Sequence, residues 1–323
     1  MTTMKNLINL LMLALLLSCA RNEPVPVPSA GSIERIPMMP SQYVPSRHID
    51  VWLPKDYPAQ APYAVLYMHD GQMLFDANTT WNKQEWRIDE VASELMQAGK
   101  VKPFIVVGVW NAGGARTSEY FPQRAFEMLE PAVQQQMTEY YQKAMDLDDD
   151  EVVPVYSDRY LKFLVEELKP VIEQRYQVSP GQQDTFLMGS SMGGLISMYG
   201  LAEYPQVFSG AACLSTHWPG NMGDGPDNPV PAAFYSYIEK HFPPPGSNRI
   251  YFDHGTETLD ASYADRQIEV DKRLRQKNYG EDNWMTRTFA GADHSEKAWA
   301  ARVHIPLEFL LRKSPDSGEK APE

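Results

Sequence analysis

The segment LMGSSMGG, residues 187–194, places a serine among closely spaced glycines directly after an apolar run. The sequence before it, DTFLMG at 184–189, is typical of a buried strand, and the sequence after it has helical character. Gly189, Ser191 and Gly193 match the pattern G-x-S-x-G, in which a sharp strand-to-helix turn exposes a serine hydroxyl. A glycine-rich structural turn is the alternative interpretation. The strand before the motif and the helix after it favour a nucleophile at Ser191.

Short apolar segments alternate with helical patterns along the rest of the chain. The predicted strands are residues 48–54, 64–69, 104–110, 184–189, 209–215, 249–254 and 284–289. Helical spacing occurs at 161–172, where Pro170 is expected to kink or shorten the helix, and again at 268–274 and 299–310. Several strands are apolar throughout, as strands buried on both faces are. The alternation predicts an α/β fold with a mostly parallel central sheet and helices on both faces.

Residues 111–157 interrupt this alternation between a strand and the helix before the serine motif. They are rich in Gln, Met, Tyr and acidic residues. A long excursion at this position predicts an inserted lid or a wall that faces the substrate. The whole catalytic domain is expected to span 32–313, and the polar tail 314–323 is expected to be disordered.

The N-terminus has the character of an export signal. Lys5 precedes the apolar run NLINLLMLALLLSC, so residues 1–19 are predicted to be a signal peptide. The end of this run, LLSC, resembles the bacterial lipobox, which implies that Cys19 is lipidated and holds the protein to a membrane on the periplasmic or cell-surface side. An ordinary cleaved signal peptide is the alternative. Residues 20–31, rich in proline, are predicted to be an extended tether.

The composition argues against several classes of partner. The chain has 29 basic and 42 acidic residues, a formal net charge of −13, so no nucleic-acid partner is expected. It contains no HExxH motif, no clustered cysteine and histidine ligands and no dinucleotide fingerprint. We therefore expect neither a metal nor a cofactor, and the sequence does not indicate an oligomeric state.

A serine hydroxyl needs a base to accept its proton as it attacks a carbonyl carbon. In this type of fold the acid and the histidine follow the serine along the chain. His294 satisfies this order, because acidic residues lie between it and Ser191, whereas His254 is expected to be packed near the site. Asp260 and Glu257, in the loop GTETLD, are both candidates for the acid that orients the imidazole. Asp260 is preferred and Glu257 stays open.

Two main-chain N–H groups are expected to stabilise the oxyanion. One belongs to Met192, at the start of the helix after Ser191. The other belongs to Gln72, since Gly71 in YMHDGQMLFD lets the backbone turn toward the pocket, although a plain β-turn is the alternative. The candidates for the wall of the substrate pocket are Trp110, Tyr120, His217 and Trp218; packing in the core is the alternative for Trp110, Tyr120 and Trp218.

Four motifs in this order, YMHDGQMLFD, GSSMGG, YFDHGTETLD and HSEKAW, resemble the bacterial putative-esterase family of α/β-hydrolases. The likeness extends over about residues 32 to 312 and includes DVWLPKDY, NAGGARTSEYFP and SDRYLKFLVEELKP. The family includes feruloyl, acetylxylan and enterochelin esterases and mycolyltransferases. By resemblance Ser191 is the nucleophile, His294 the base, and Gln72 and Met192 the oxyanion donors. The acid varies among relatives, some of which use a Ser–His pair.

The resemblance implies a serine esterase that acts through an acyl-enzyme. Its predicted substrates are small-molecule or oligosaccharide esters, in particular acetyl or feruloyl esters of carbohydrates. A siderophore esterase and an acyltransferase are the alternatives within this chemistry. From another class, a non-catalytic binding module that keeps the hydrolase fold at the cell envelope is the remaining alternative.

Overall fold

The computed structural model of the protein describes residues 23–144, 155–246 and 248–313. The predicted signal peptide with Cys19, residues 145–154 of the predicted insert, and the predicted tail 314–323 lie outside these ranges. Among the described residues, no helix is both long enough and apolar enough to cross a bilayer.

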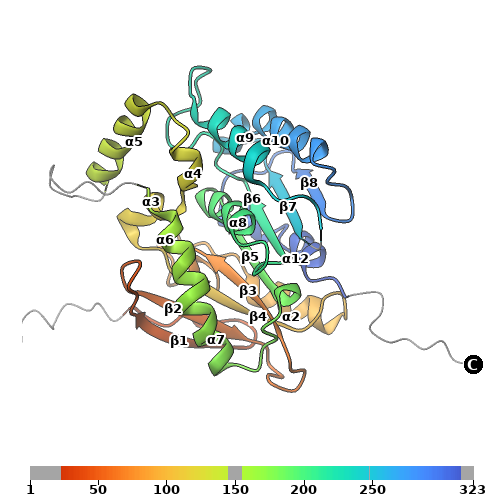
Figure 1. The fold of residues 1–323 in the computed structure, drawn as a ribbon. Coiled ribbons are helices and arrows are strands. Elements are labelled where there is room, and N and C mark those ends of the chain that lie inside the picture. The colour runs from red at the N-terminus through yellow and green to blue at the C-terminus, as the bar shows by residue number, and fades with distance from the viewer. Residues whose placement is uncertain (1–22, 145–154, 247, 314–323) are drawn as a thin grey trace, which may run out of the picture.

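An eight-stranded sheet forms the centre of the molecule (Figure 1). Its strands are β1 (Ser32–Met39), β2 (Arg47–Leu53), β3 (Ala64–His69), β4 (Phe104–Val109), β5 (Thr185–Ser190), β6 (Gly210–Leu214), β7 (Arg249–His254) and β8 (Trp284–Thr288). Their spatial order is β1-β2-β4-β3-β5-β6-β7-β8. β1 and β2 are antiparallel to their neighbours, and the strands from β4 to β8 run parallel. The predicted α/β architecture is confirmed.

Helices cover both faces of this sheet. The α-helices are α2 (Ile88–Gln97), α3 (Arg116–Tyr120), α4 (Gln123–Phe126), α5 (Pro131–Ala144), α6 (Ser157–Lys162), α7 (Lys169–Arg175), α8 (Met192–Glu203), α9 (Val230–His241), α10 (Ala264–Gln276), α11 (Glu296–Ala300) and α12 (His304–Leu310). Shorter 3₁₀ turns are η1 (Gly71–Met73), η2 (Gly113–Ala115), η4 (Gln182–Asp184) and η5 (Thr258–Ser262), and η3 (Phe163–Leu168) is π-helical. Figure 1 shows α6, α7 and α8 crossing one face of the sheet.

Side chains alternate between the two faces of the sheet along each strand, and this divides the core into two clusters. In β3, Val65 and Tyr67 point into the larger cluster, which includes residues of α6, α8, α9 and α10. Leu66 and Met68 point to the opposite face, where α2, α11 and α12 pack. Successive side chains of a strand face opposite sides, so a strand covered on both faces must be apolar at every position. This is why the central parallel strands β3 and β4 are nearly continuous hydrophobic runs in the sequence, whereas the edge strand β8 (WMTRT) is not.

All seven predicted strands are present, and the structure adds β1, which the sequence analysis did not predict. The helix predicted at 161–172 runs through Pro170 and continues to Arg175, so Pro170 does not shorten it. The π-helical segment η3 directly precedes Pro170, which lies in the first turn of α7, where its missing N–H is not needed. The helix predicted at 299–310 is two helices, α11 and α12, with a break at 301–303.

The segment before β1 is extended, but it is not a free tether. The N–H of Val27 donates to Asp76 Oδ2 at 3.0 Å, and the N–H of Ala30 donates to Asp89 Oδ2 at 3.0 Å. The Ala30 carbonyl accepts from Trp52 Nε1 at 2.6 Å. These bonds fasten the described part of the segment, 23–31, along the surface of the domain. The predicted tether is thus fastened to the domain over those of its residues that the structure describes.

Candidate active site

Ser191 lies on a strained turn between β5 and α8. Its φ of 58° and ψ of −122° lie in a region that non-glycine residues rarely adopt. Its N–H donates to the Leu214 carbonyl on β6 at 2.9 Å, which fixes the turn. A Cβ on Gly189 would lie 2.7 Å from the carbonyl of Gly193, so the strand and the helix approach each other more closely than any side chain allows. The predicted elbow geometry is therefore present, and it exposes Ser191 at the carboxyl end of the sheet.

His294 is held by Asp260. Its Nδ1 lies 2.6 Å from Asp260 Oδ1, and the main-chain N–H of His294 donates to Thr258 Oγ1 at 2.9 Å. Burial disfavours the Asp260 carboxylate, but the hydrogen bonds from His294, Ser215 and the Gly255 N–H outweigh it, and the pKa of Asp260 lies below its usual value. An ionised carboxylate only accepts hydrogen bonds, so the Nδ1 of His294 donates and Nε2 is the basic nitrogen.

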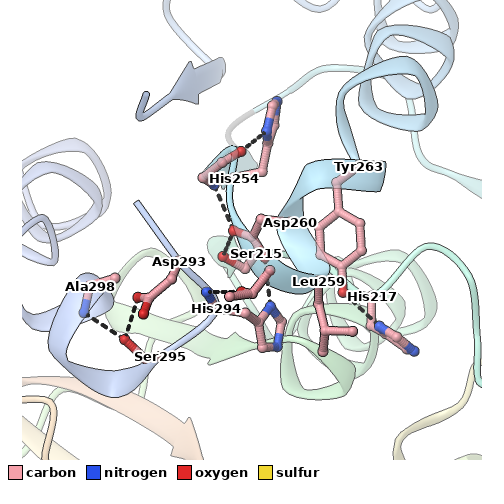
Figure 2. A network of polar contacts seen from close by, with 12 residues as sticks. Ser215, His217, His254, Leu259, Asp260, Tyr263, Asp293, His294, Ser295 and Ala298 are labelled. Carbon is pink, nitrogen blue, oxygen red and sulfur yellow. Dashed lines mark hydrogen bonds and ion pairs between the residues drawn. The ribbon is translucent and has the colours of Figure 1, made fainter. Parts of the chain in front are cut away.

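The second oxygen of Asp260 joins a buried polar network (Figure 2). Oδ2 accepts from Ser215 Oγ at 2.5 Å and from the Gly255 N–H at 2.6 Å. Ser215 Oγ in turn accepts from Trp299 Nε1 and Arg302 Nη2, both at 2.9 Å. Ser215 thus uses its one donor and both lone pairs. The hydrogen bonds to Oδ2 fix the orientation of the Asp260 carboxylate.

Glu257, the alternative acid, is exposed, and its main-chain N–H donates to the Ala292 carbonyl at 3.0 Å. The structure therefore brings Asp260, and not Glu257, against His294. His254 is buried, with Nδ1 2.7 Å from the Gly255 carbonyl and Nε2 3.2 Å from Thr288 Oγ1. It is packed near the site, as predicted.

The two predicted oxyanion donors lie in the first turns of α8 and η1. Met192 is the first residue of α8, where the first amides of a helix have no acceptor within the helix. Gln72 lies in η1, directly after β3, and lines the same cavity as Ser191. A Cβ on Gly71 would lie 2.4 Å from the carbonyl carbon of Gly108, so only glycine lets this turn pack against β4.

An ion pair supports the turn before Gln72. Asp70 has a φ of 57°, and its two carboxylate oxygens accept from Nε and Nη2 of Arg116, both at 2.7 Å. Asn111 Nδ2 adds a third hydrogen bond to Asp70 at 2.7 Å. Burial opposes the charge, yet Arg116 and Asn111 together lower the pKa of Asp70. Asn111 and Arg116 belong to the segment 111–157; the function of that segment as a lid stays a prediction.

A cavity of about 570 Å³ contains both Ser191 and His294. Its wall also includes Asp70, Gln72, Met73, Trp81, Asn82, Gln84, Trp86, Asn111, Arg116, Ser190, Ser295, Glu296 and Trp299. The volume lies in the range of small-molecule sites. Amide and aromatic groups are the largest share of the wall; the Asp70 carboxylate is paired with the Arg116 guanidinium, and the Glu296 carboxylate accepts a hydrogen bond from Asn82. Such a wall suits a neutral ligand that has both rings and hydroxyls.

The four residues predicted to form the pocket wall do not line this cavity. Trp110 donates from Nε1 to Asp50 Oδ2 at 2.8 Å, away from Ser191 at the antiparallel side of the sheet. Tyr120 and Trp218 are core residues, 0% and 1% exposed. His217 packs against Tyr263, whose hydroxyl lies 2.6 Å from Nδ1, and burial lowers the pKa of His217 to about 4. These aromatic groups contribute to packing because each finds its polar partner inside the protein.

The sequence analysis missed the aromatic residues that do line the cavity. Trp81 and Trp86 lie in the loop between η1 and α2, and Trp299 lies on α11. The run TTWNKQEW at 79–86 was a usable signal. It contains two tryptophans and two amides, and it follows the carboxyl end of a parallel strand, which is the edge where ligands bind in such sheets.

Comparison with known proteins agrees with this fold. The model of the family described as "Putative esterase" matches residues 45–305. The ferri-bacillibactin esterase BesA of Bacillus subtilis is 28% identical over 176 residues. That match covers 53% of this chain and 54% of the relative, about half of each protein.

Two solved structures share the fold across most of the chain. A ferulic acid esterase superimposes with a TM-score of 0.60 at 17% identity, over 87% of this chain and 98% of that chain. The enterobactin esterase FES of Shigella flexneri superimposes with a TM-score of 0.62 at 14% identity, over 88% of this chain and 60% of that chain. With the family model matched over most of its length, the chain belongs to the putative esterase family and is a carboxylic ester hydrolase with the α/β-hydrolase fold.

Proposed function

We propose that the chain hydrolyses esters through a covalent acyl-enzyme formed on Ser191. The observation that carries this proposal is the shared cavity of Ser191 and His294, together with the 2.6 Å hydrogen bond between His294 and Asp260. Nε2 of His294 accepts the proton of Ser191 as the hydroxyl oxygen attacks the ester carbonyl carbon. The same imidazole then donates that proton to the leaving alcohol, and Asp260 stabilises the imidazolium in between.

The N–H groups of Gln72 and Met192 serve as the oxyanion hole in this proposal. Negative charge develops on the carbonyl oxygen as Ser191 attacks, and preorganised N–H donors stabilise it without reorganisation. The ion pair of Arg116 with Asp70 supports this role, because it fixes the turn on which Gln72 lies. In the second step His294 activates a water, which attacks the acyl carbon and releases the acid from Ser191.

For the substrate, we propose acyl esters of carbohydrates, with acetyl or feruloyl as the acyl group. The wall of amides and tryptophans supports a neutral ligand with hydroxyls and a ring, and the fold is shared with a ferulic acid esterase. A catecholate siderophore ester is the second candidate. It is favoured by the 28% identity with the ferri-bacillibactin esterase.

The test of the mechanism is the variant Ser191→Ala. We expect it to lower the turnover of p-nitrophenyl acetate by about 10⁴-fold or more, because it removes the hydroxyl that forms the acyl-enzyme beside His294. A fluorophosphonate probe should label the wild-type protein at Ser191 and leave the variant unlabelled. Circular dichroism of both proteins checks that the fold persists. Equal turnover in the variant would remove Ser191 from this role, and an unlabelled, inactive wild type would favour the non-catalytic binding module.

The substrate class is tested by acid released from acetylated and feruloylated oligosaccharides and from catecholate siderophores. Faster release from the siderophores would favour the second candidate. Formation of new esters from added alcohols, with little free acid, would identify an acyltransferase.

We also propose that the protein is exported and anchored through a lipid on Cys19, on the periplasmic or cell-surface side of a membrane. Cys19 lies outside the described residues, and the proposal rests on the sequence of residues 1–19. Two or more acyl chains would hold the protein firmly, since each buried methylene contributes about 0.8 kcal/mol.

A further inference from the structure

Trp81 is an exposed aromatic side chain at the mouth of the cavity that holds Ser191. It is 82% exposed, although its side chain forms part of the cavity wall. Leaving an indole in water forgoes the free energy that burying its large apolar surface would supply. Trp86 and Trp299, in contrast, are 2% and 5% exposed, and their ring centroids lie 5.3 Å apart. The cavity therefore has two covered tryptophans and one that is open to a ligand.

The loop that carries Trp81 is held in place. Asn82 Nδ2 donates to Glu296 Oε2 at 2.7 Å, and the N–H of Lys297 donates to Gln84 Oε1 at 3.1 Å. The N–H of Gln84 also donates to Asn82 Oδ1 at 3.1 Å within the loop. These bonds connect Asn82 and Gln84, which directly follow the tryptophan, to α11. A preorganised loop lowers the entropic cost of binding, which is the property required of a ligand platform.

The same bonds place the Trp81 loop on the His294 side of the cavity. Glu296 and Lys297 follow His294 by two and three residues, so the Trp81 loop is fastened beside the imidazole. In ester hydrolysis the imidazole protonates the leaving alcohol. The alcohol part of the ester therefore lies toward His294, on the side of the cavity where Trp81 and Glu296 stand.

We infer that Trp81 is a stacking platform for a sugar ring in the leaving alcohol, an inference that rests on the proposed ester hydrolysis at Ser191. A sugar has a face of C–H groups that packs on an indole and a rim of hydroxyls that hydrogen-bond to carboxylates and amides. Glu296 and Asn82 supply those polar groups next to the ring. Trp81 thus determines specificity for the alcohol, and it takes no part in the chemical step.

The experiment compares sugar esters with methyl esters of the same acid: feruloyl arabinose with methyl ferulate, and acetyl xylose with methyl acetate. For the wild type, we expect a higher kcat/KM for the sugar ester of at least one pair. Trp81→Ala should lower kcat/KM for that sugar ester by about tenfold, mainly through KM, the size expected for one stacked ring. The methyl ester, which has no ring in its alcohol, should change less than about twofold.

Trp81→Tyr keeps a flat ring and should restore most of the preference. Ile268→Ala is the matched control, because Ile268 is a large exposed side chain on α10, 59% exposed, and is not part of the cavity wall. Ile268→Ala should leave kcat/KM for both the sugar ester and the methyl ester unchanged.

Three results would overturn the inference: an unchanged preference in Trp81→Ala, a wild type that prefers both methyl esters, or no turnover of either sugar ester. Each would leave the proposed ester hydrolysis at Ser191 standing if p-nitrophenyl acetate is still hydrolysed in a Ser191-dependent way, although the third would also count against carbohydrate esters as the substrate. Failure of that assay would instead refute the proposed function.

Discussion

At the scale of single residues, Asp260 controls which nitrogen of His294 is basic. Its ionised carboxylate accepts a hydrogen bond from the Nδ1–H of His294, so Nε2 carries no proton and is the base. An asparagine at this position would offer an amide N–H to Nδ1, which favours the wrong tautomer of the imidazole. Substitution by asparagine therefore tests the charge of this side chain separately from its packing, because asparagine has nearly the same shape as aspartate.

We predict that Asp260→Asn lowers kcat for p-nitrophenyl acetate by about 10³- to 10⁴-fold. Glu257→Gln is the control and should stay near the wild type, because Glu257 is exposed and the structure gives its side chain no contact with His294. Steady-state kinetics of both variants measures this. Wild-type turnover in Asp260→Asn would show that Ser191 and His294 work as a pair without an acid.

The sequence predicted which residues meet at the centre of the site better than which residues surround it. Ser191 is recognisable because the strained turn requires glycines at fixed positions beside it. Asp260 could be narrowed only to two carboxylates in one loop, since the turn of η5 buries one and exposes the other. The wall was mispredicted because burial of Tyr120 and Trp218 depends on α9, α10 and the segment around them, which no local pattern reveals.

At the scale of elements, the first turn of α2 carries a buried carboxyl group. Asp89 is 0% exposed, and its Oδ2 accepts from the N–H of Ala30. Burial, together with a hydrogen bond to Glu90, raises the pKa of Asp89 to about 7. The positive end of the helix dipole favours a charge here, but by less than the cost of burial.

This pKa makes the stability of the fold depend on pH. In the unfolded chain Asp89 has an ordinary pKa near 3.9, so the folded state favours the neutral acid. The corresponding stability is complete below about pH 4 and is lost as the pH rises through 7.

We therefore predict that Asp89→Asn, which is neutral at every pH and keeps an oxygen for Ala30, raises the free energy of unfolding at pH 8. The gain should exceed about 1 kcal/mol, since one pKa unit corresponds to about 1.4 kcal/mol. It should vanish toward pH 4. Urea unfolding at both pH values measures the difference. A gain of equal size at the two pH values would indicate a packing effect instead of titration.

Elements were predictable where the hydrophobic pattern is strong. The central parallel strands, such as β4 (FIVVGV), are buried at every position because helices cover both faces of the sheet. β1 was not predicted because it is an antiparallel edge strand whose sequence, SIERIPMM, mixes polar and apolar residues. Only two of its residues are buried. The helix from Ser157 to Arg175 was expected to be interrupted at Pro170, but the π-helical segment η3 lets the chain continue.

At the scale of the whole molecule, the proposed anchor decides where the enzyme works. We predict that Cys19→Ala moves the protein from the membrane fraction to the soluble fraction, because it removes the only proposed site of acylation. Cys213→Ala is the control: Cys213 is buried in β6, where burial raises its thiol pKa, and its loss should leave the protein with the membrane. Fractionation followed by immunoblotting measures both. A Cys19→Ala protein that stays with the membrane would refute the lipid anchor.

The hydrogen bonds of Val27 and Ala30 to the domain set a limit on distance from the bilayer. Only four peptide links separate Cys19 from Glu23, the first described residue, and a fully stretched chain of that length covers about 14 Å. An acylated enzyme would thus stay close to the lipid headgroups and diffuse along the membrane surface. It would not diffuse freely through the compartment. Its natural esters would then be those displayed at that surface or delivered to it by transport.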